Sequence, residues 1–201
     1  MSEGDKMSFY KTGTPYTGFV KLEHWRRPTD SYDTIVVRAS DSVVGLLYDA
    51  TNDRVLLIRQ ARAAMIREDN PEGMITECVA GRFDVNLGPK ALMVKEALEE
   101  ASVVITEKDV TVLNQGKPMA LSAGVLTERS YVVFAEVHPD QVTGSDDDTF
   151  GLASEGESIQ RVWVSTSEFL TMVVDEIRVF ALQQFLGTIV LLEDSKESKD
   201  G

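Results

Sequence analysis

The sequence predicts an α/β (α+β) fold with a mixed β-sheet, preceded by an arm of β-strands. Its 201 residues are the usual length of one domain, or of one domain with a small appendage. Hydrophobic residues make up 43% and charged residues 26%, which is the balance of a globular protein with a buried core. Strand-like and helix-like segments alternate without the regular period of a doubly wound sheet or a barrel. We therefore expect layers of helices around a mixed sheet.

The N-terminal segment, residues 1–45, is expected to form the β arm. Residues 1–34 combine Gly, Pro and Thr turn signals with several aromatic residues, a pattern typical of short strands. The β-rich runs at 35–38 and 43–48 then lead from the arm into the next domain.

Residues 46–193 are expected to form the main domain, and residues 194–201 a disordered, charged tail. A helix is predicted at 89–101, because Pro89 suits a first helical position and the following residues are good helix formers. The other expected elements are strands at 54–60, 76–80, 110–114, 130–137 and 159–164, a mobile acidic loop at 143–158, and helices at 166–176 and 180–193.

The chain is strongly acidic, with a formal net charge of −13. No nucleic-acid polymer is expected as a partner, because affinity for a phosphate backbone comes largely from positive charge. A small phosphate-bearing substrate stays open, because a cation held by the acidic groups would be the largest local charge.

The expected location is the cytoplasm. The single cysteine, Cys78, excludes an intramolecular disulfide and suits a reducing compartment. The opening residues, MSEGDKMSF, lack the pattern of a signal peptide, and the apolar stretch at 185–192 is too short to span a bilayer. We therefore expect no membrane partner.

The most informative segment is the acidic stretch of the predicted helix at 89–101. Glu96 and Glu100 are four residues apart and share one helix face, and Glu99 flanks that face. Like charges at this spacing destabilise a helix, so the cluster favours a compensating cation, and Mg²⁺ or Mn²⁺ suits carboxylate oxygens. Spacing alone also allows a solvated acidic face, because E-x-x-E-E is common in helices.

The stretch GRFDVNLGPKALMVKEALEEASV, from Gly81 to Val103, resembles the Nudix box, G-x5-E-x7-R-E-U-x-E-E-x-G-U, where U is apolar. The opening glycine, the three glutamates of the helix and the apolar positions match in register. Lys95 stands where arginine is usual, Leu87 replaces the first glutamate, and Ser102 replaces the second glycine.

The flanking segments resemble the ADP-ribose and GDP-mannose pyrophosphatase branch of the Nudix hydrolases. They are VLLIRQAR, ECVAGRFD, LSAGVLTERSYVVFAEV and SEGESI, in the order that this branch has them, with Ala123 in place of a usual proline. The resemblance covers roughly residues 36–193. It implies a Nudix-type α/β/α sandwich with a mixed β-sheet.

The resemblance also implies roles for individual residues. Divalent metal ions, Mg²⁺ with Mn²⁺ as an alternative, would be held by Glu96, Glu100, Glu157 and the backbone carbonyl of Ala80. Glu99 would be a further ligand or orient one, and Glu155 would be the general base of the catalytic pair. The expected substrate-binding residues are Arg59, Gln60, Arg62 and Glu128. Strand alternation places Gln60 and Arg62 on one face and Arg59 on the other, so all three cannot reach one ligand from a regular strand.

Two functions remain open at this point. The first is Mg²⁺-dependent hydrolysis of a nucleoside diphosphate sugar, of the GDP-mannose or ADP-ribose type, to a nucleoside monophosphate and a sugar phosphate. The second is a catalytically weakened Nudix-fold binding module for a nucleotide or nucleotide sugar, favoured by the departures at Leu87, Ser102 and Ala123.

The resemblance further implies a homodimer in which the N-terminal strands cross to the partner, and the apolar residues of the arm suit that role.

Overall fold

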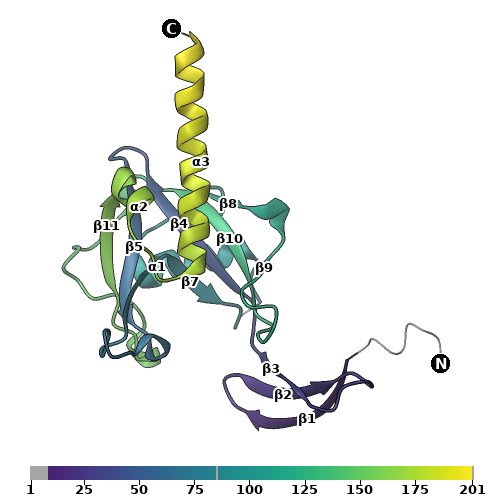
Figure 1. Ribbon diagram of the computed structural model, residues 1–201. Coiled ribbons are helices and arrows are strands. Elements are labelled where there is room, and N and C mark those ends of the chain that lie inside the picture. Colours follow the sequence, from purple (N-terminus) through teal and green to yellow (C-terminus); the bar gives the residue numbers. More distant parts are fainter. Residues whose placement is uncertain (1–8, 85, 201) are drawn as a thin grey trace.

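The computed structural model describes residues 9–84 and 86–200, which form a main domain with a separate arm (Figure 1). The main domain holds an eight-stranded sheet, and the arm holds a three-stranded sheet. The arm projects from one side of the main domain, and the last helix projects from another (Figure 1).

The arm consists of the antiparallel strands β1 (Tyr10–Thr17), β2 (Lys21–Arg26) and β3 (Thr34–Arg38). Its centre is ionic, because buried Glu23 accepts hydrogen bonds from Lys11, the indole N–H of Trp25 and Arg38. The hydrogen bond from Arg38, followed by those from Trp25 and Lys11, outweighs the effect of burial and lowers the pKa of Glu23 to about 2. Charge pairing therefore stabilises the centre of the arm, while most of its aromatic residues stay exposed: Phe9, Tyr10, Tyr16, Phe19 and Tyr32.

The main sheet is mixed, as the sequence predicts. Its strand order is β11–β5–β4–β10–β8, and the β4–β10 pair is parallel while the other pairs along this path are antiparallel. The bounds are β4 (Ser42–Asp49), β5 (Arg54–Ala61), β8 (Val110–Val112), β10 (Arg129–Glu136) and β11 (Gln160–Ser165). Three short strands complete the sheet: β6 (Met74–Glu77) beside β5, β7 (Val79–Arg82) beside β4, and β9 (Met119–Ala120) beside β10.

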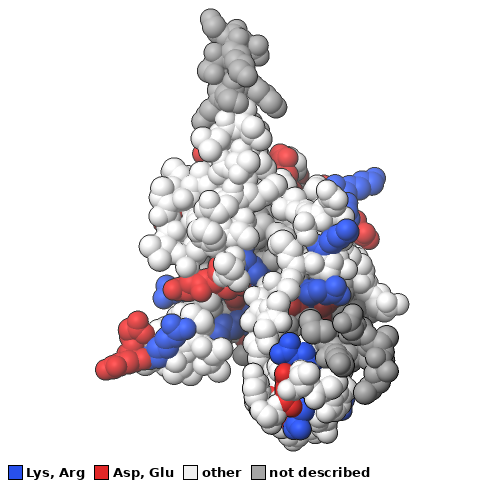
Figure 2. All heavy atoms as spheres, turned by 45° about the vertical axis from the view of Figure 1, so that its right-hand side comes forward, with Lys and Arg blue, Asp and Glu red and all other residues white. Residues whose placement is uncertain are grey.

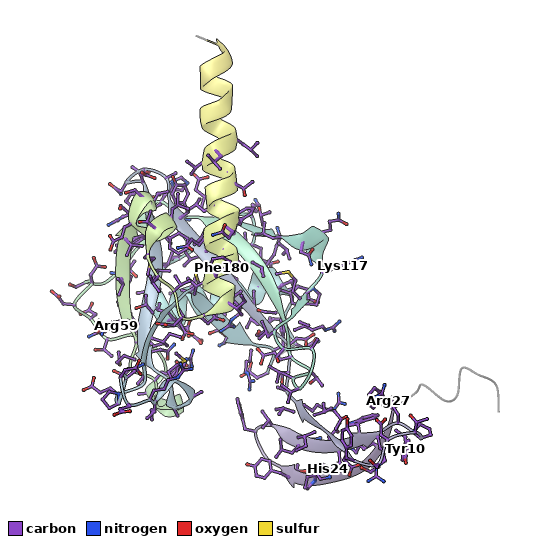
Figure 3. All side chains as sticks on the ribbon, in the orientation of Figure 1. Tyr10, His24, Arg27, Arg59, Lys117 and Phe180 are labelled. Atoms are coloured by element: carbon purple, nitrogen blue, oxygen red, sulfur yellow. The ribbon has the colours of Figure 1, made fainter. Side chains whose placement is uncertain are left out.

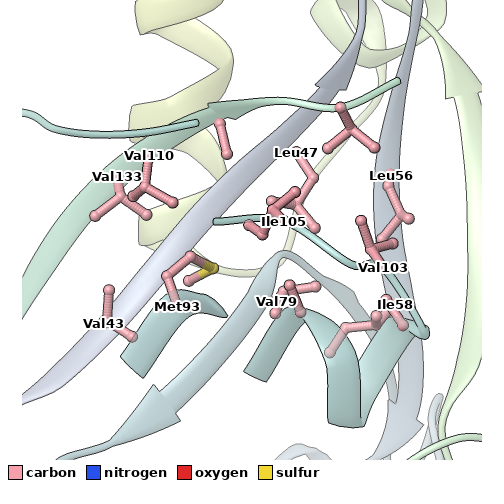
Figure 4. Packing of buried hydrophobic residues seen from close by; sticks show 14 of the residues in the cluster. Val43, Leu47, Leu56, Ile58, Val79, Met93, Val103, Ile105, Val110 and Val133 are labelled. Atoms are coloured by element: carbon pink, nitrogen blue, oxygen red, sulfur yellow. The ribbon is translucent and has the colours of Figure 1, made fainter. Parts of the chain in front are cut away.

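Helices cover both faces of the sheet. The helix α1 (Pro89–Ala101) covers one face, and α2 (Thr166–Thr171) with α3 (Ile177–Asp200) covers the other. The strand β4 supplies both cores, because Val43 and Leu47 point toward α1, whereas Val44 and Leu46 point toward α2 and α3. Figure 4 shows the core on the α1 side, where Met93 packs near Val43 and Val133. The result is an α/β/α sandwich.

Several boundaries differ from the expected ones. The strand β4 begins at Ser42, so the arm ends before residue 45 and the central strand of the main sheet starts earlier than expected. The strand expected at 76–80 is divided at Cys78 into β6 and β7, which pair with different neighbours. The strand β9 has no counterpart in the expected elements.

The C-terminal helices also differ from expectation. The helix α2 ends at Thr171 rather than 176, and α3 begins at Ile177 and continues to Asp200, where a disordered tail was expected from residue 194. The side chains drawn around the first part of α3 are mostly uncharged in Figure 2, and the exposed residues of this helix include Ile177 and Phe180, the latter labelled in Figure 3. No helix among residues 9–84 and 86–200 is long and apolar enough to cross a membrane.

Candidate active site

The pairing of β7 with β4 and the packing of α1 against β7 build the candidate active site. Ala80 and Gly81 lie opposite Val44 and Val43 in the sheet. Glu96 and Glu100 project from the buried face of α1 toward this strand. A Cβ atom on Gly81 would lie 2.2 Å from the carboxyl carbon of Glu96, so only glycine lets the helix carboxylates approach the strand this closely.

A cavity of about 500 Å³ opens over these residues. It brings together the expected residues Ala80, Glu96, Glu99, Glu100, Glu157, Arg62 and Glu128. It also contains residues that the sequence did not indicate: Glu77, Arg82 and Arg178. Carboxylates and guanidinium groups therefore share one cavity, which is the combination that a charged substrate held through a cation requires.

The two innermost helix carboxylates are costly to ionise. Burial raises the pKa of Glu100 to about 8, against the hydrogen bond that its Oε2 accepts from the backbone N–H of Ala80 at 3.0 Å. Burial likewise raises the pKa of Glu96 to about 7, and the charges of Glu99 and Glu157 raise it further. At neutral pH the two groups therefore tend to keep a proton unless a nearby positive charge stabilises their ionised forms.

The side chain of Lys95 supplies one such positive charge. Its Nζ lies 2.6 Å from Oε2 of Glu99 and 3.3 Å from Oε1 of Glu96. Burial lowers the pKa of Lys95, but its hydrogen bonds and charge interactions with the two glutamates outweigh burial and raise the pKa above the ordinary lysine value. Lys95 therefore stays charged and partly neutralises the helix carboxylates.

The donor set fits a hard divalent cation. Glu96, Glu99, Glu100 and Glu157 reach the same cavity with oxygen ligands, and Ala80 of the adjoining strand lines it. Burial, with a smaller contribution from neighbouring carboxylates, raises the pKa values of Glu96 and Glu100, and a bound cation would stabilise their ionised forms. Within the described ranges, no three acidic, histidine or cysteine residues already stand in a complete metal-binding arrangement.

The acidic loop brings Glu157 to the cavity. Oε2 of Glu157 accepts the backbone N–H of Leu152 at 3.0 Å, and the N–H of Gly151 donates to the carbonyl of Glu99 at 2.9 Å. The backbone of Glu155 belongs to a short 3-10 helix, Ala153–Glu155, next to this turn. The side chain of Glu155 lies outside what the structure describes, so its role as general base stays a prediction.

The opposite side of the cavity is basic and is organised by a buried carboxylate. Gln60 and Arg62 project from the same face of β5, as strand alternation predicts, and both donate to Oε1 of Glu77, at 2.8 and 2.9 Å. Arg82 donates a hydrogen bond to Glu128 at 3.1 Å, so the Glu128 carboxylate is paired and holds the Arg82 side chain in place. Each carboxylate thereby fixes the direction of one cavity arginine.

Among the cavity residues that the sequence did not indicate are Glu77, Arg82 and Arg178. Glu77 reaches Gln60 and Arg62 because β6 pairs with β5 in a register that sets Glu77 opposite Ile58, and the sequence does not give that register. Arg178 lies at the start of α3, where no motif marks it. A signal was available for Arg82, because it follows Ala80 and Gly81 directly on β7, the strand that packs against α1.

Arg59 lies apart from the other predicted substrate-binding residues. Like Gln60, it is absent from the residues that line the main cavity, and it lines a second pocket with Met172 and Asp175. Figure 3 shows it at the outer edge of the main domain. The physical reason is the alternation along β5, which turns Arg59 away from the face that carries Gln60 and Arg62. The main cavity therefore gives no support to Arg59 as a substrate-binding residue, and that role stays a prediction.

Comparison with known proteins places the chain in a family. It is 32% identical to the GDP-mannose pyrophosphatase of Klebsiella pneumoniae over 159 residues, which is 77% of this chain and 75% of the relative. It is 33% identical to the GDP-mannose pyrophosphatase of Yersinia enterocolitica over 65% of this chain and 62% of the relative. The protein of the same name from Salmonella typhimurium is 34% identical over 64% of this chain and 61% of the relative. No model of a protein family matches the chain. The α/β/α sandwich, the glutamates of α1 facing one cavity, and these relatives together show that the chain belongs to the GDP-mannose pyrophosphatase branch of the Nudix hydrolases.

Proposed function

We propose that this protein hydrolyses the diphosphate of a nucleoside diphosphate sugar, of the GDP-mannose or ADP-ribose type, in a reaction that depends on Mg²⁺. The products are a nucleoside monophosphate and a sugar phosphate. The observation that carries the proposal is the single cavity in which Glu96, Glu99, Glu100 and Glu157 face Arg62 and Arg82. The relatives named GDP-mannose pyrophosphatase support the substrate class.

Different residues of the cavity would have different roles in such a hydrolysis. Glu96, Glu100, Glu157 and the carbonyl of Ala80 are the candidate ligands, and a divalent cation bound there would neutralise diphosphate charge and make a water nucleophilic near neutral pH. Arg62 offers a guanidinium fork to a phosphate oxygen, and Glu77 keeps that fork in place. Glu155 is the proposed general base, because it lies in the chain between Leu152 and Glu157, which both line the cavity.

A substrate screen tests this proposal. The protein is incubated with GDP-mannose and with ADP-ribose in the presence of Mg²⁺, and the monophosphates are separated by ion-exchange chromatography. We expect both products of one diphosphate bond cleavage from at least one substrate, and no products when EDTA removes the cation. Turnover in EDTA would contradict the Mg²⁺ dependence, and absence of turnover with every nucleoside diphosphate sugar would contradict the hydrolase.

A second function, a weakened Nudix-fold binding module, is favoured by the ion pair between Lys95 and Glu99. In this pair the Lys95 ammonium, a cation of the protein itself, already binds the Glu99 carboxylate of the candidate metal site. Leu87, where the box usually has glutamate, is exposed and offers no carboxylate. Calorimetry with GDP-mannose and Mg²⁺ separates the two functions, since binding heat without product formation supports the module and product formation excludes it.

We also propose a homodimer formed through the arm. The exposed aromatic residues of the arm include Tyr16, Phe19 and Tyr32, whose exposed fractions are 52%, 86% and 69%. A partner that covers these rings would remove apolar surface from water. Light scattering at micromolar concentration tests this, and a monomeric mass would contradict it.

A further inference from the structure

Arg161, on β11, is a buried arginine that no motif or predicted role explains. Its side chain is 1% exposed. Its guanidinium donates to Oδ1 of Asp146 at 2.7 Å and to three backbone carbonyls, those of Ala101 at 2.8 Å, Thr143 at 2.9 Å and Gly144 at 3.2 Å. An arginine can serve this many acceptors because its planar fork carries five N–H donors.

These acceptors belong to two segments that must be held together for the candidate site to exist. The carbonyl of Ala101 is at the C-terminal end of α1, the helix that carries Glu96, Glu99 and Glu100. Helix ends leave carbonyls without partners and carry partial negative charge, so a buried guanidinium stabilises this end. The other three acceptors lie in the acidic loop, before the turn that carries Glu157.

Further contacts join the same loop to the same helix end. The backbone N–H of Gly151 donates to the carbonyl of Glu99, and the N–H of Thr143 donates to the carbonyl of Ser102, both at 2.9 Å. Phe150 pairs with Ile159 at the start of the sheet, and the guanidinium of Arg161 lies over the Phe150 ring. The position of Glu157 relative to the helix carboxylates thus depends on how firmly the loop is attached to this end of α1.

We propose that Arg161 is a positioning residue that fixes the acidic loop on the end of α1 and thereby sets the affinity of the site for a divalent cation through Glu157. The inference rests on the proposed Mg²⁺-dependent function. It also gives a role to Asp146, one of three consecutive aspartates at 146–148. Asp146 is the member of that run that pairs with Arg161 from the solvent side, with 58% of its side chain exposed.

The test compares Asp146→Ala with Asp147→Ala, two substitutions that remove the same charge from the same loop. The side chain of Asp147 makes no hydrogen bond or ion pair within the part of the chain that the structure describes. Arg161→Lys is the third variant, because lysine keeps the charge but cannot serve all four acceptors. Mn²⁺ binding is measured in the full chain from the free-ion electron paramagnetic resonance signal. The thermal midpoint without metal, and the substrate KM and kcat at saturating Mg²⁺, are measured alongside.

We expect Arg161→Lys to weaken Mn²⁺ binding by about 10-fold, as residues behind metal ligands commonly do, and Asp146→Ala to weaken it by a few-fold. Asp147→Ala should bind Mn²⁺ with the affinity of the unmodified protein. The substrate KM at saturating Mg²⁺ should stay unchanged in all three variants. If Arg161→Lys does not fold, the comparison of Asp146→Ala with Asp147→Ala still tests the inference, because Asp146 is exposed and we expect its substitution to leave the chain folded.

Two results would overturn the inference. One is Mn²⁺ affinity that is equal in Asp146→Ala, Asp147→Ala and the unmodified protein. The other is a lower thermal midpoint in Asp146→Ala without any change in Mn²⁺ affinity, which would make the contact merely structural. A different failure, in which the unmodified protein neither binds Mn²⁺ nor turns over substrate, overturns the proposed function and the inference with it.

Discussion

The ammonium nitrogen of Lys95 lies 2.6 Å from Oε2 of Glu99, one turn further along α1, and 3.3 Å from Glu96. The lysine thus balances part of the negative charge of the candidate metal site from within the same helix. A divalent cation bound at the candidate site would interact with the same carboxylates as the Lys95 ammonium.

Replacing Lys95 with methionine tests this relationship. Without the ammonium, the repulsion among the glutamates is uncompensated in the metal-free protein, so we expect a lower thermal midpoint. Mg²⁺ should then raise that midpoint by more than it does in the unmodified protein, because the cation relieves more repulsion. Lys108→Met is the matched control, since Lys108 is exposed and outside the cavity. A Mg²⁺ response that is equal in both variants would contradict this account.

Stability should also depend on pH through Glu96 and Glu100. Their pKa values are raised to about 7 and about 8, above the ordinary value of 4.5, so the folded state binds more protons than the unfolded state between these limits. The contribution of the two groups is therefore fully present below pH 4.5 and is lost as the pH rises through about 7 and 8. In metal-free protein, we expect the thermal midpoint to fall between pH 6 and pH 8.5, and Mg²⁺ to restore more of it at pH 8.5.

The control for this pH dependence is Glu100→Gln, which removes one of the two titrating groups. Its midpoint should fall less between pH 6 and pH 8.5 than that of the unmodified protein. A fall of the same size would assign the pH dependence to other groups.

The close approach of Gly81 to Glu96 predicts a cost for any side chain at this position. In Gly81→Ala, the new Cβ would meet the Glu96 carboxyl group and push it from its place. We expect a loss of roughly 1–3 kcal/mol in the free energy of unfolding, typical of overpacking, together with weaker Mg²⁺ binding. Chemical denaturation measures the first effect. Gly124→Ala, where a Cβ would meet no atom within 4 Å, should be nearly neutral, and equal effects at the two glycines would contradict the packing argument.

The end of α1 offers a stabilising substitution. Ser102, at a position where the Nudix box has glycine, adopts a left-handed conformation with φ 51° and ψ 42°, which costs a residue with a side chain more than it costs glycine. Its hydroxyl hydrogen-bonds to Thr143 at 2.8 Å at an exposed position. Glycine would remove about 1 kcal/mol of strain and lose a weaker solvent-exposed hydrogen bond, so we expect Ser102→Gly to raise the free energy of unfolding by roughly 0.5 kcal/mol. A lower free energy of unfolding by chemical denaturation would show that the hydroxyl contact is worth more than the strain.

The local features of the site could be predicted from the sequence because short-range rules determine them. Proline at the first position and a run of good helix formers give α1 the bounds Pro89–Ala101, as expected. The helical period then places Glu96 and Glu100 on one face, and strand alternation separates Arg59 from Gln60 and Arg62.

The remaining features depend on long-range pairing that the sequence does not encode locally. Glu77 meets Gln60 and Arg62 only through the register of β6 against β5. Asp146 lies in the stretch expected to be a mobile acidic loop, yet it pairs with the buried Arg161, which follows it by 15 residues and comes close only after the loop folds back. The division of the strand at Cys78 likewise follows from the competing partners β5 and β4, not from composition.

The most direct test of the central claim is the turnover of GDP-mannose by Glu100→Gln in saturating Mg²⁺. Glutamine keeps an oxygen that can accept the Ala80 N–H, so the fold is retained, but the carboxylate charge is lost. Because even residues behind metal ligands cost ~10- to 100-fold, we expect kcat/KM to fall by more than about 100-fold, with the exposed Glu107→Gln unchanged. Turnover by Glu100→Gln at the rate of the unmodified protein would contradict the assignment of this cavity as the active site.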